Sequence, residues 1–239
     1  MKFKPEEKIC VSIAGKNFYE VTNQLEVLNE AGAKLVEMRL DFLIDNKYLE
    51  VLKAASNYGF KIVSTVRCRT DGGVFDKSEE QRKKILLESA SIATYVDVEY
   101  DTYLSDEQFI EKLKDRGSKI LLSKHFFEYN PNHQTLIMIL ERMKDYGDLY
   151  KIITSPKNLF DANNLLSLYK YDWTKGRLIA FCMGEQWAFT RLLSIFLGAP
   201  FTYAHNGNSP VASGQLSFIE VKNELEKLSW LGEKWHFSQ

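Results

Sequence analysis

The sequence predicts an α/β fold, a single (β/α)8 TIM barrel that spans residues 1–239 as one domain. Short apolar segments typical of buried strands recur along the chain, and segments with a helical spacing of apolar residues lie between them. Eight such strand–helix units in 239 residues, with no Pro/Gly/Ser-rich linker, are typical of this barrel. A doubly wound open sheet is the alternative, but it usually has fewer strands, and the sequence has no GxGxxG phosphate loop.

The strands are expected where β-branched and other apolar residues run without interruption. They are Ile9–Ile13, Leu35–Leu40, Ile62–Val66, Tyr95–Glu99, Ile120–Ser123, Leu149–Thr154, Leu178–Cys182 and Phe201–Ala204. A last helix is expected at Gly214–Leu228. The segment from Ser105 to Gln108 has the form of a capping box at a helix start, and Gly117 falls where that helix should end.

Composition and charge exclude several classes of function. The 31 basic and 32 acidic residues give a net charge of −1, so nothing attracts the chain to nucleic acid or to an anionic membrane surface. The N-terminus lacks the apolar core of a signal peptide, and no apolar run approaches the ~18 residues of a membrane span. Cys10, Cys68 and Cys182 form no CxxC pair, which disfavours a disulfide framework or a zinc site. We therefore expect a cytoplasmic protein that acts on a small molecule.

Lys151 lies in the middle of the apolar strand candidate Leu149–Thr154. In a parallel strand covered on both faces, its ammonium group would have little contact with water. Because burying an ammonium is costly, this lysine must either find a carboxylate partner or lose its proton and become a neutral, nucleophilic amine. A third possibility is that the aliphatic stem of Lys151 packs in the core while its amine reaches solvent at the strand end. The sequence of this segment alone does not decide among the three.

Charged residues also alternate with apolar ones on neighbouring strands. Glu37 and Arg39 do so in the second strand, and a period of two places both on one face. Asp97 and Glu99 follow the same pattern in the fourth strand. If the apolar rows pack against the helices, these charges point into the barrel, where burying them is expensive. Ligand binding is one explanation for these interior charges. The alternatives are a structural ion pair between Glu37 and Arg39, and neutralisation of Lys151 by Asp97 and Glu99.

Catalytic groups of such barrels lie at the C-terminal ends of the strands and in the loops that follow. Arg67 follows the third strand, and Asp71 precedes two glycines in the next loop. His125 lies just past the expected end of the fifth strand; taken singly, such a histidine is more often a hydrogen-bonded loop residue than a catalyst. The charged segment from Asp76 to Lys84 is expected to be a solvated helix start without a function.

Taken together, these residues resemble the type I 3-dehydroquinate dehydratases, the Schiff-base-forming barrel enzymes of the shikimate pathway. The resemblance covers almost the whole chain and implies conversion of 3-dehydroquinate to 3-dehydroshikimate without a cofactor or a metal. Its motifs, in chain order, are Val11-Ser12, Glu37-Met-Arg39, Thr65-Val-Arg67 with Asp71-Gly-Gly73, Tyr95-Val-Asp97-Val-Glu99, Ser123-Lys-His125-Phe-Phe, Tyr150-Lys151-Ile, Met183 eight residues before Arg191, and Ser213-Gly214-Gln215.

The resemblance implies a role for each candidate residue. Lys151 would form an imine with the substrate ketone and so make the adjacent C–H acidic. His125 would move the proton as general base and acid, oriented by Asp71, which stands where the family usually has a glutamate. Arg191 would bind the substrate carboxylate through its planar fork. The other residues implied in substrate binding are Ser12, Glu37, Arg39, Arg67, Met183 and Gln215.

The chain departs from the family pattern at two places in the site. The shorter Asp71 requires the loop to move in or a water to mediate its contact with the histidine. Val211 stands where the family usually has a serine, and either Ser209 or Ser213 would replace it. A homodimer is expected from the apolar residues near the C-terminus, which are Leu225, Leu228, Trp230, Leu231 and Trp235.

Other functions stay open at this point. A class I aldolase also uses a barrel lysine and an imine, but its usual phosphorylated substrates need a glycine-rich cradle, for which residues 206–209 are the better candidate. A metal-dependent barrel built on Glu37, Asp97 and Glu99 would have Arg39 and Lys151 crowding the cation. A non-catalytic metabolite-binding barrel would be expected to lack the lysine or the histidine, and both are present.

Overall fold

The computed structural model describes residues 3–207 and 210–235, with side chains up to residue 229. Its strands form one parallel sheet in the order β7-β6-β5-β4-β3-β2-β1-β8. The strands are β1 (Ile9–Ile13), β2 (Leu35–Arg39), β3 (Lys61–Thr65), β4 (Tyr95–Glu99), β5 (Lys119–Phe126), β6 (Leu149–Thr154), β7 (Leu178–Cys182) and β8 (Thr202–His205). The α-helices are α1 (Phe18–Glu30), α2 (Tyr48–Asn57), α3 (Glu79–Ser89), α4 (Tyr100–Ser105), α5 (Glu107–Lys114), α6 (His133–Lys144), α7 (Leu159–Leu166), α8 (Phe189–Phe196) and α9 (Phe218–Trp235).

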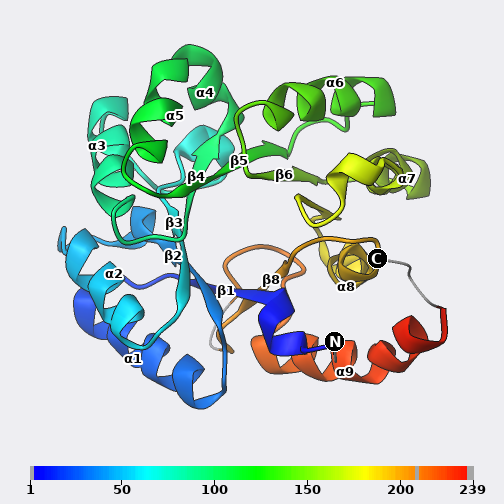
Figure 1. Cartoon of the computed structure of the whole chain (residues 1–239), viewed down its shortest axis with the longest axis horizontal. Coiled ribbons are helices and arrows are strands. Elements are labelled where there is room, and N and C mark those ends of the chain that lie inside the picture. The colour runs from blue at the N-terminus through cyan, green and yellow to red at the C-terminus, as the bar shows by residue number, and fades with distance from the viewer. Residues whose placement is uncertain (1–2, 208–209, 236–239) are drawn as a thin grey trace.

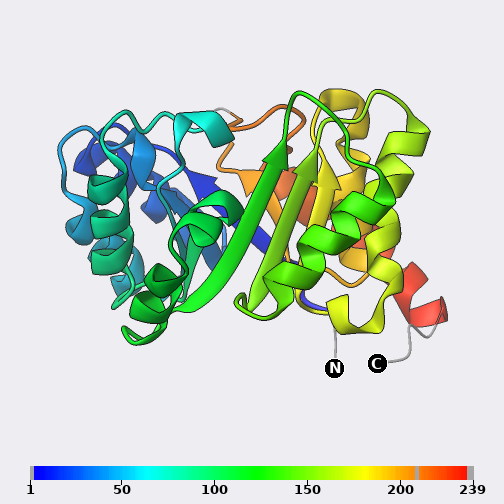
Figure 2. The same cartoon turned by 90° about the horizontal axis from the view of Figure 1, so that it is seen from above.

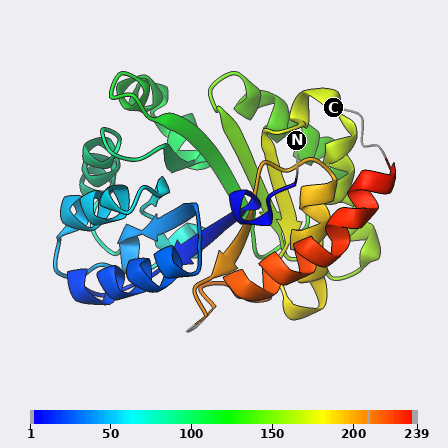
Figure 3. The same ribbon diagram turned by 60° about the horizontal axis from the view of Figure 1, so that its bottom comes forward.

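The chain winds once around a central barrel, with the helices on the outside (Figure 1). The green strands β5 and β6 run side by side and point the same way (Figure 2), and α9 lies on the outer surface beside α8 (Figure 3). This arrangement confirms the predicted (β/α)8 barrel. The barrel is nearly closed rather than closed, because no hydrogen-bonded ladder joins β7 to β8 within the described residues.

Apolar side chains fill two layers of the barrel. The larger layer lies between the strands and the outer helices, where residues such as Val36, Met38 and Val98 are buried. The smaller layer fills the lower interior of the barrel and includes Leu35, Val63, Leu121, Leu149, Ile179 and Phe201. Because the side-chain period of a strand is two, each inward apolar residue is followed two positions later by another inward residue nearer the C-terminal end. Those later positions carry the site.

Most strand boundaries lie within one residue of the prediction, and larger differences occur at the end of β5, at both ends of the last helix and at the predicted capping box. β5 continues to Phe126, so His125 lies inside the strand rather than past its end, because pairing with β6 continues through His125 and Ile153. The last helix begins at Phe218, not at Gly214. Ser105 is the last residue of α4, and the cap of α5 is Asp106, whose side chain accepts from the Phe109 amide.

None of the helices in the described part of the chain is both long and apolar enough to cross a membrane. Cys10, Cys68 and Cys182 are all free thiols.

Candidate functional site

A cavity of about 270 Å³ lies at the C-terminal ends of the strands. All ten residues singled out from the sequence line it, although they come from seven different strands or the segments after them. They are Ser12, Glu37, Arg39, Arg67, Asp71, His125, Lys151, Met183, Arg191 and Gln215. The structure therefore gathers into one space residues that are up to 203 positions apart in the sequence.

Lys151 is buried in the interior of the barrel and has a carboxylate partner. Its Nζ lies 2.7 Å from Oδ2 of Asp97 and 3.9 Å from Oε1 of Glu37. The ammonium also lies 4.6 Å from the centre of the Tyr203 ring, within range of a cation–π contact. A solvent-reaching amine is excluded by this geometry, because the Lys151 side chain is only 5% exposed.

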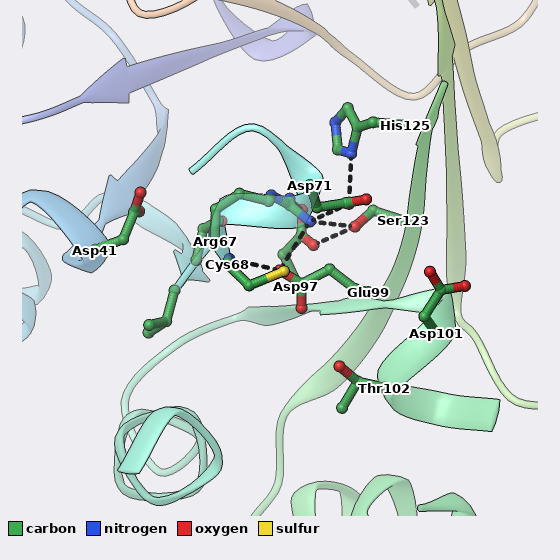
Figure 4. A network of polar contacts seen from close by, with 12 residues as sticks. Asp41, Arg67, Cys68, Asp71, Asp97, Glu99, Asp101, Thr102, Ser123 and His125 are labelled. Carbon is green, nitrogen blue, oxygen red and sulfur yellow. Dashed lines mark hydrogen bonds and ion pairs between the residues drawn. The ribbon is translucent and has the colours of Figure 1, made fainter. Parts of the chain in front are cut away.

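Arg67 is the centre of the interior charge network. Its Nη2 donates to Asp97 Oδ2 at 2.7 Å, and its Nη1 donates to Ser123 Oγ at 2.7 Å. Ser123 in turn donates to the other oxygen of Asp97 at 2.6 Å. Burial acts to raise the pKa of Asp97, but the charges of Arg67 and Lys151 outweigh it and hold that pKa well below its usual range. Figure 4 shows Arg67 among Asp71, Ser123 and Asp97.

His125 is held by Asp71 on one edge and by Phe127 on one face. Its Nδ1 lies 2.9 Å from Asp71 Oδ2 (Figure 4). The Phe127 ring is stacked parallel to the imidazole, with 5.9 Å between the two ring centroids. Burial acts to raise the pKa of Asp71, but its hydrogen bond with His125 and the nearby charge of Arg67 lower it overall. Because the ionised carboxylate can only accept, Nδ1 carries the proton and Nε2 is the basic nitrogen.

Burial and the charge of Arg67 lower the pKa of His125 to about 4, although Asp71 acts in the opposite direction. The histidine is therefore neutral near pH 7 and available as a base.

The short Asp71 side chain reaches His125 directly because its loop lies close to the strand. Gly73 donates its amide to the Cys68 carbonyl at 2.9 Å, and a Cβ on Gly73 would lie 2.0 Å from the Arg67 carbonyl oxygen. Gly72 has φ +80° and lies against the Phe127 ring. The two glycines thus allow an approach that larger residues would block, and the 2.9 Å contact between Asp71 and His125 is direct.

Polar side chains from β1, β2 and the segment after β8 line another part of the cavity wall. Ser12 Oγ donates to Glu37 Oε2 at 2.8 Å and accepts from Gln215 Nε2 at 3.2 Å. Thr65 donates to the other oxygen of Glu37 at 3.0 Å. Arg39 does not pair with Glu37, the possibility left open by the sequence; it makes two hydrogen bonds to Asp41 of 2.9 and 2.7 Å.

Arg191 is a buried cation without an acidic partner within the described residues. It is 2% exposed, and its guanidinium carbon lies 4.2 Å from the centre of the Phe181 ring. Nε and Nη2 donate to the carbonyls of Gly214 and Ser213. Burial lowers the pKa of Arg191 to about 10, so the group stays charged near neutrality. A buried, unpaired cation at a cavity wall favours an anionic ligand.

Ser213 lines the cavity beside Val211, whereas Ser209 lies outside the described residues, so both serines stay candidates for the replacement of the family serine. Met183 follows the end of β7 and supplies an apolar wall.

Sequence reasoning missed several lining residues. Tyr203, Phe127 and Phe181 have an apolar periodicity that does not distinguish a site from a core. Asp41 is not among the residues singled out from the sequence, yet it holds Arg39 through two hydrogen bonds and accepts from the Val74 amide at 3.2 Å. No metal-ligand group of three or more His, Cys, Asp or Glu side chains occurs in the part of the chain that the structure describes.

A parallel barrel with an interior lysine held by carboxylates, and a neutral histidine in the same cavity, has the arrangement of a barrel enzyme whose site lies at the C-terminal ends of the strands. Comparison with known sequences then gives the particular family. The model of the family "Type I 3-dehydroquinase" matches residues 9–230, and the chain belongs to this family of lyases. This finding confirms the resemblance drawn from the sequence.

Individual relatives agree. The chain is 31% identical over 218 residues to a 3-dehydroquinate dehydratase of Methanothermobacter thermautotrophicus, covering 91% of this chain and 95% of the relative. It is 32% identical over 210 residues to the corresponding protein of Pyrococcus abyssi, covering 87% and 94%. A crystal structure of type I 3-dehydroquinate dehydratase from Clostridium difficile, with covalently modified comenic acid, has a TM-score of 0.82 at 26% identity and covers 93% of this chain and 92% of that one.

Proposed function

We propose that the protein is a 3-dehydroquinate dehydratase that removes water from 3-dehydroquinate, giving 3-dehydroshikimate, through an imine on Lys151. The observation that carries the proposal is the buried Lys151–Asp97 contact of 2.7 Å in a cavity that also holds His125. Family membership favours this reaction over an aldolase or a non-catalytic barrel. The reaction belongs to the shikimate pathway of aromatic amino acid biosynthesis.

The interior carboxylates suit a nitrogen that stays cationic during the reaction. Lys151 gives a proton to the neutral imidazole of His125, and its amine then adds to the substrate ketone. The same proton leaves with the hydroxyl of this adduct as water, which gives a protonated imine and restores the neutral histidine. Asp97 and Glu37 already face Nζ, at 2.7 and 3.9 Å, so the positive iminium needs no large rearrangement of charge. The iminium withdraws electrons from the adjacent carbon, whose C–H becomes acidic.

His125 then moves the proton. Its unprotonated Nε2 takes the proton from that carbon, and the resulting imidazolium returns it to the departing hydroxyl, which leaves as water. The charge on the imidazolium is stabilised by Asp71, 2.9 Å from Nδ1. Hydrolysis of the imine releases 3-dehydroshikimate and restores the amine.

The walls of the cavity suit the rest of the substrate. Arg191 is a buried cation without an acidic partner among the described residues, and we assign the substrate carboxylate to it. Ser12, Glu37 and Gln215 offer both donors and acceptors to ring hydroxyls. Arg39 and Arg67 hold the site together, and Met183 packs against the apolar face of the ring.

We place the reaction in the cytoplasm, in keeping with three free thiols and a biosynthetic role.

We also propose a homodimer. Leu225 belongs to the core, and the side chains of Trp230, Leu231 and Trp235 lie outside the described residues. Support comes from apolar side chains exposed at the starts of α7 and α8, where Leu159 is 74% and Phe189 50% exposed. Light scattering should give twice the chain mass of 27.7 kDa, and a monomer at micromolar concentration would contradict the proposal.

The imine assignment is tested by trapping with borohydride. Lys151→Ala should abolish turnover and the reduced adduct together, because Lys151 alone is proposed to form the imine. His125→Ala should lose about 10²–10⁴-fold in kcat, as for a lost general acid/base, yet still form an adduct that peptide mass mapping locates on Lys151. The mechanism would be refuted if active wild-type protein, treated with substrate and borohydride together, formed no adduct on Lys151.

The role of Arg191 is tested by Arg191→Lys. Lysine retains the charge but loses the planar fork, so KM for 3-dehydroquinate should rise about tenfold or more while kcat falls less. Steady-state rates, followed by the ultraviolet absorbance of the conjugated product, separate the two constants. Unchanged KM and kcat would remove Arg191 from the site.

The low pKa of His125 predicts the pH dependence. The base is lost only when the imidazole becomes protonated, so kcat/KM should fall as the pH drops through about 4 and not near the ordinary value of 6.5. Rates measured from about pH 3 to pH 8 test this, with circular dichroism at each pH as the control for unfolding. An acidic limb near pH 6.5 in folded protein would contradict the assignment of His125 in its neutral form.

A further inference from the structure

The buried charge network continues from Arg67 to a residue outside the cavity, Arg82 of α3. Ser78 caps this helix in a capping box with Gln81, so the predicted helix start is confirmed. The segment from Asp76 to Lys84 was expected to be solvated, and this expectation is wrong for Arg82, which is only 1% exposed. A buried guanidinium is costly unless its donors are satisfied, which makes its partners informative.

All five N–H groups of Arg82 have acceptors. Two of them donate to the two oxygens of Glu79, at 2.7 Å each. The others donate to Thr102 Oγ1, to the Val66 carbonyl at 3.1 Å, and to the Glu99 carboxylate. Such a set of directed contacts fixes the guanidinium in both position and plane.

Two of these acceptors hold the chain on either side of Arg67. Val66 precedes it and accepts from Arg82 directly. Cys68 follows it, and its amide donates to Glu99 Oε1 at 3.3 Å, the oxygen that also lies 3.4 Å from Arg67 Nη1. The other oxygen of Glu99 is the one bound by Arg82.

We propose that Arg82 is a positioning residue that holds Arg67, and through it the Asp71–His125 pair, in the geometry of the site. The link is continuous, because Arg67 Nη1 lies 3.4 Å from Asp71 Oδ2, which lies 2.9 Å from His125. The packing of a helix on a barrel does not require an arginine, since apolar residues are often as stabilising as a buried ion pair. The effect on turnover rests on the proposed function, whereas the effect on His125 does not.

Loss of Arg82 has a predictable electrostatic consequence. Arg67 would become the only cation left within 4 Å of Glu99 in the described structure, so it should be drawn toward Glu99 and away from Asp71. The charged groups that face His125 are Asp71 from the loop after β3, Arg67 from the end of β3, and Lys151 from β6. With Arg67 withdrawn, protonation of His125 should become easier.

The test is an NMR titration of the His125 ring in the wild type, Arg82→Met and Glu79→Gln, with the signal assigned by its absence in His125→Ala. We expect the His125 midpoint to rise by about one pH unit or more in Arg82→Met. Glu79→Gln is the matched control, because it changes a contact of the same guanidinium on the side away from Glu99, and it should leave the midpoint unchanged. In turnover, kcat of Arg82→Met should fall about tenfold or more, as for a misplaced catalytic group, with KM little changed.

The outcomes separate the two proposals. A wild-type protein without dehydratase activity would refute the proposed function, while the titration would still decide the role of Arg82. An unchanged His125 midpoint in folded Arg82→Met, or an equal shift in Glu79→Gln, would overturn the positioning role. If Arg82→Met does not fold, Arg82→Gln replaces it, because an amide keeps hydrogen-bond donors but removes the charge beside Glu99. A folded Arg82→Gln with wild-type midpoint and kcat would overturn the proposal equally.

Discussion

Two buried cations share one carboxylate oxygen, and the rest of the site depends on this contact. Asp97 Oδ2 lies 2.7 Å from both Lys151 and Arg67, and Asp97 is only 1% exposed. Removing one partner of a buried ion pair typically costs about 3–5 kcal/mol, because the remaining charge is left without compensation. Because one carboxylate cannot neutralise two cations, the other acidic groups of the interior, Glu37 and Glu99, must lie close to Lys151 and Arg67 to balance their charge.

Strand register brings the members of this cluster together. Thr65 lies opposite Asp97 in the β3–β4 ladder, and Ser123 lies opposite both Glu99 and Lys151 in the ladders of β5 with its neighbours. In a parallel barrel, a shift of one residue in any of these ladders would turn a charged side chain toward the outer helices. The strand pairings that place Lys151 inside the barrel also place its carboxylate partners there. The fold and the site therefore depend on the same strand register.

The sequence predicted the parts of the structure that have a local signal. Alternation with apolar residues was enough to point Glu37 and Asp97 into the barrel, and continuous apolar runs were enough to locate most strands. Partner choice has no such signal. Arg39 binds Asp41 rather than Glu37, and Arg82 is buried although its neighbours are polar, because both outcomes depend on contacts between elements far apart in the sequence.

Charge is distributed unevenly over the cavity, and this gives the proposed reaction a direction. At the interior end, Lys151 is already balanced by Asp97 and Glu37, so this end favours a neutral carbonyl that becomes cationic only on forming the imine. Elsewhere on the cavity wall, Arg191 has no acidic partner among the described residues and favours an anion. The proposed substrate has its carboxylate and its ketone on different carbons of one ring, so a single orientation would satisfy both parts of the cavity. In the reversed orientation Arg191 would lack an anion and a carboxylate would face Asp97 and Glu37, so the charges favour the proposed orientation.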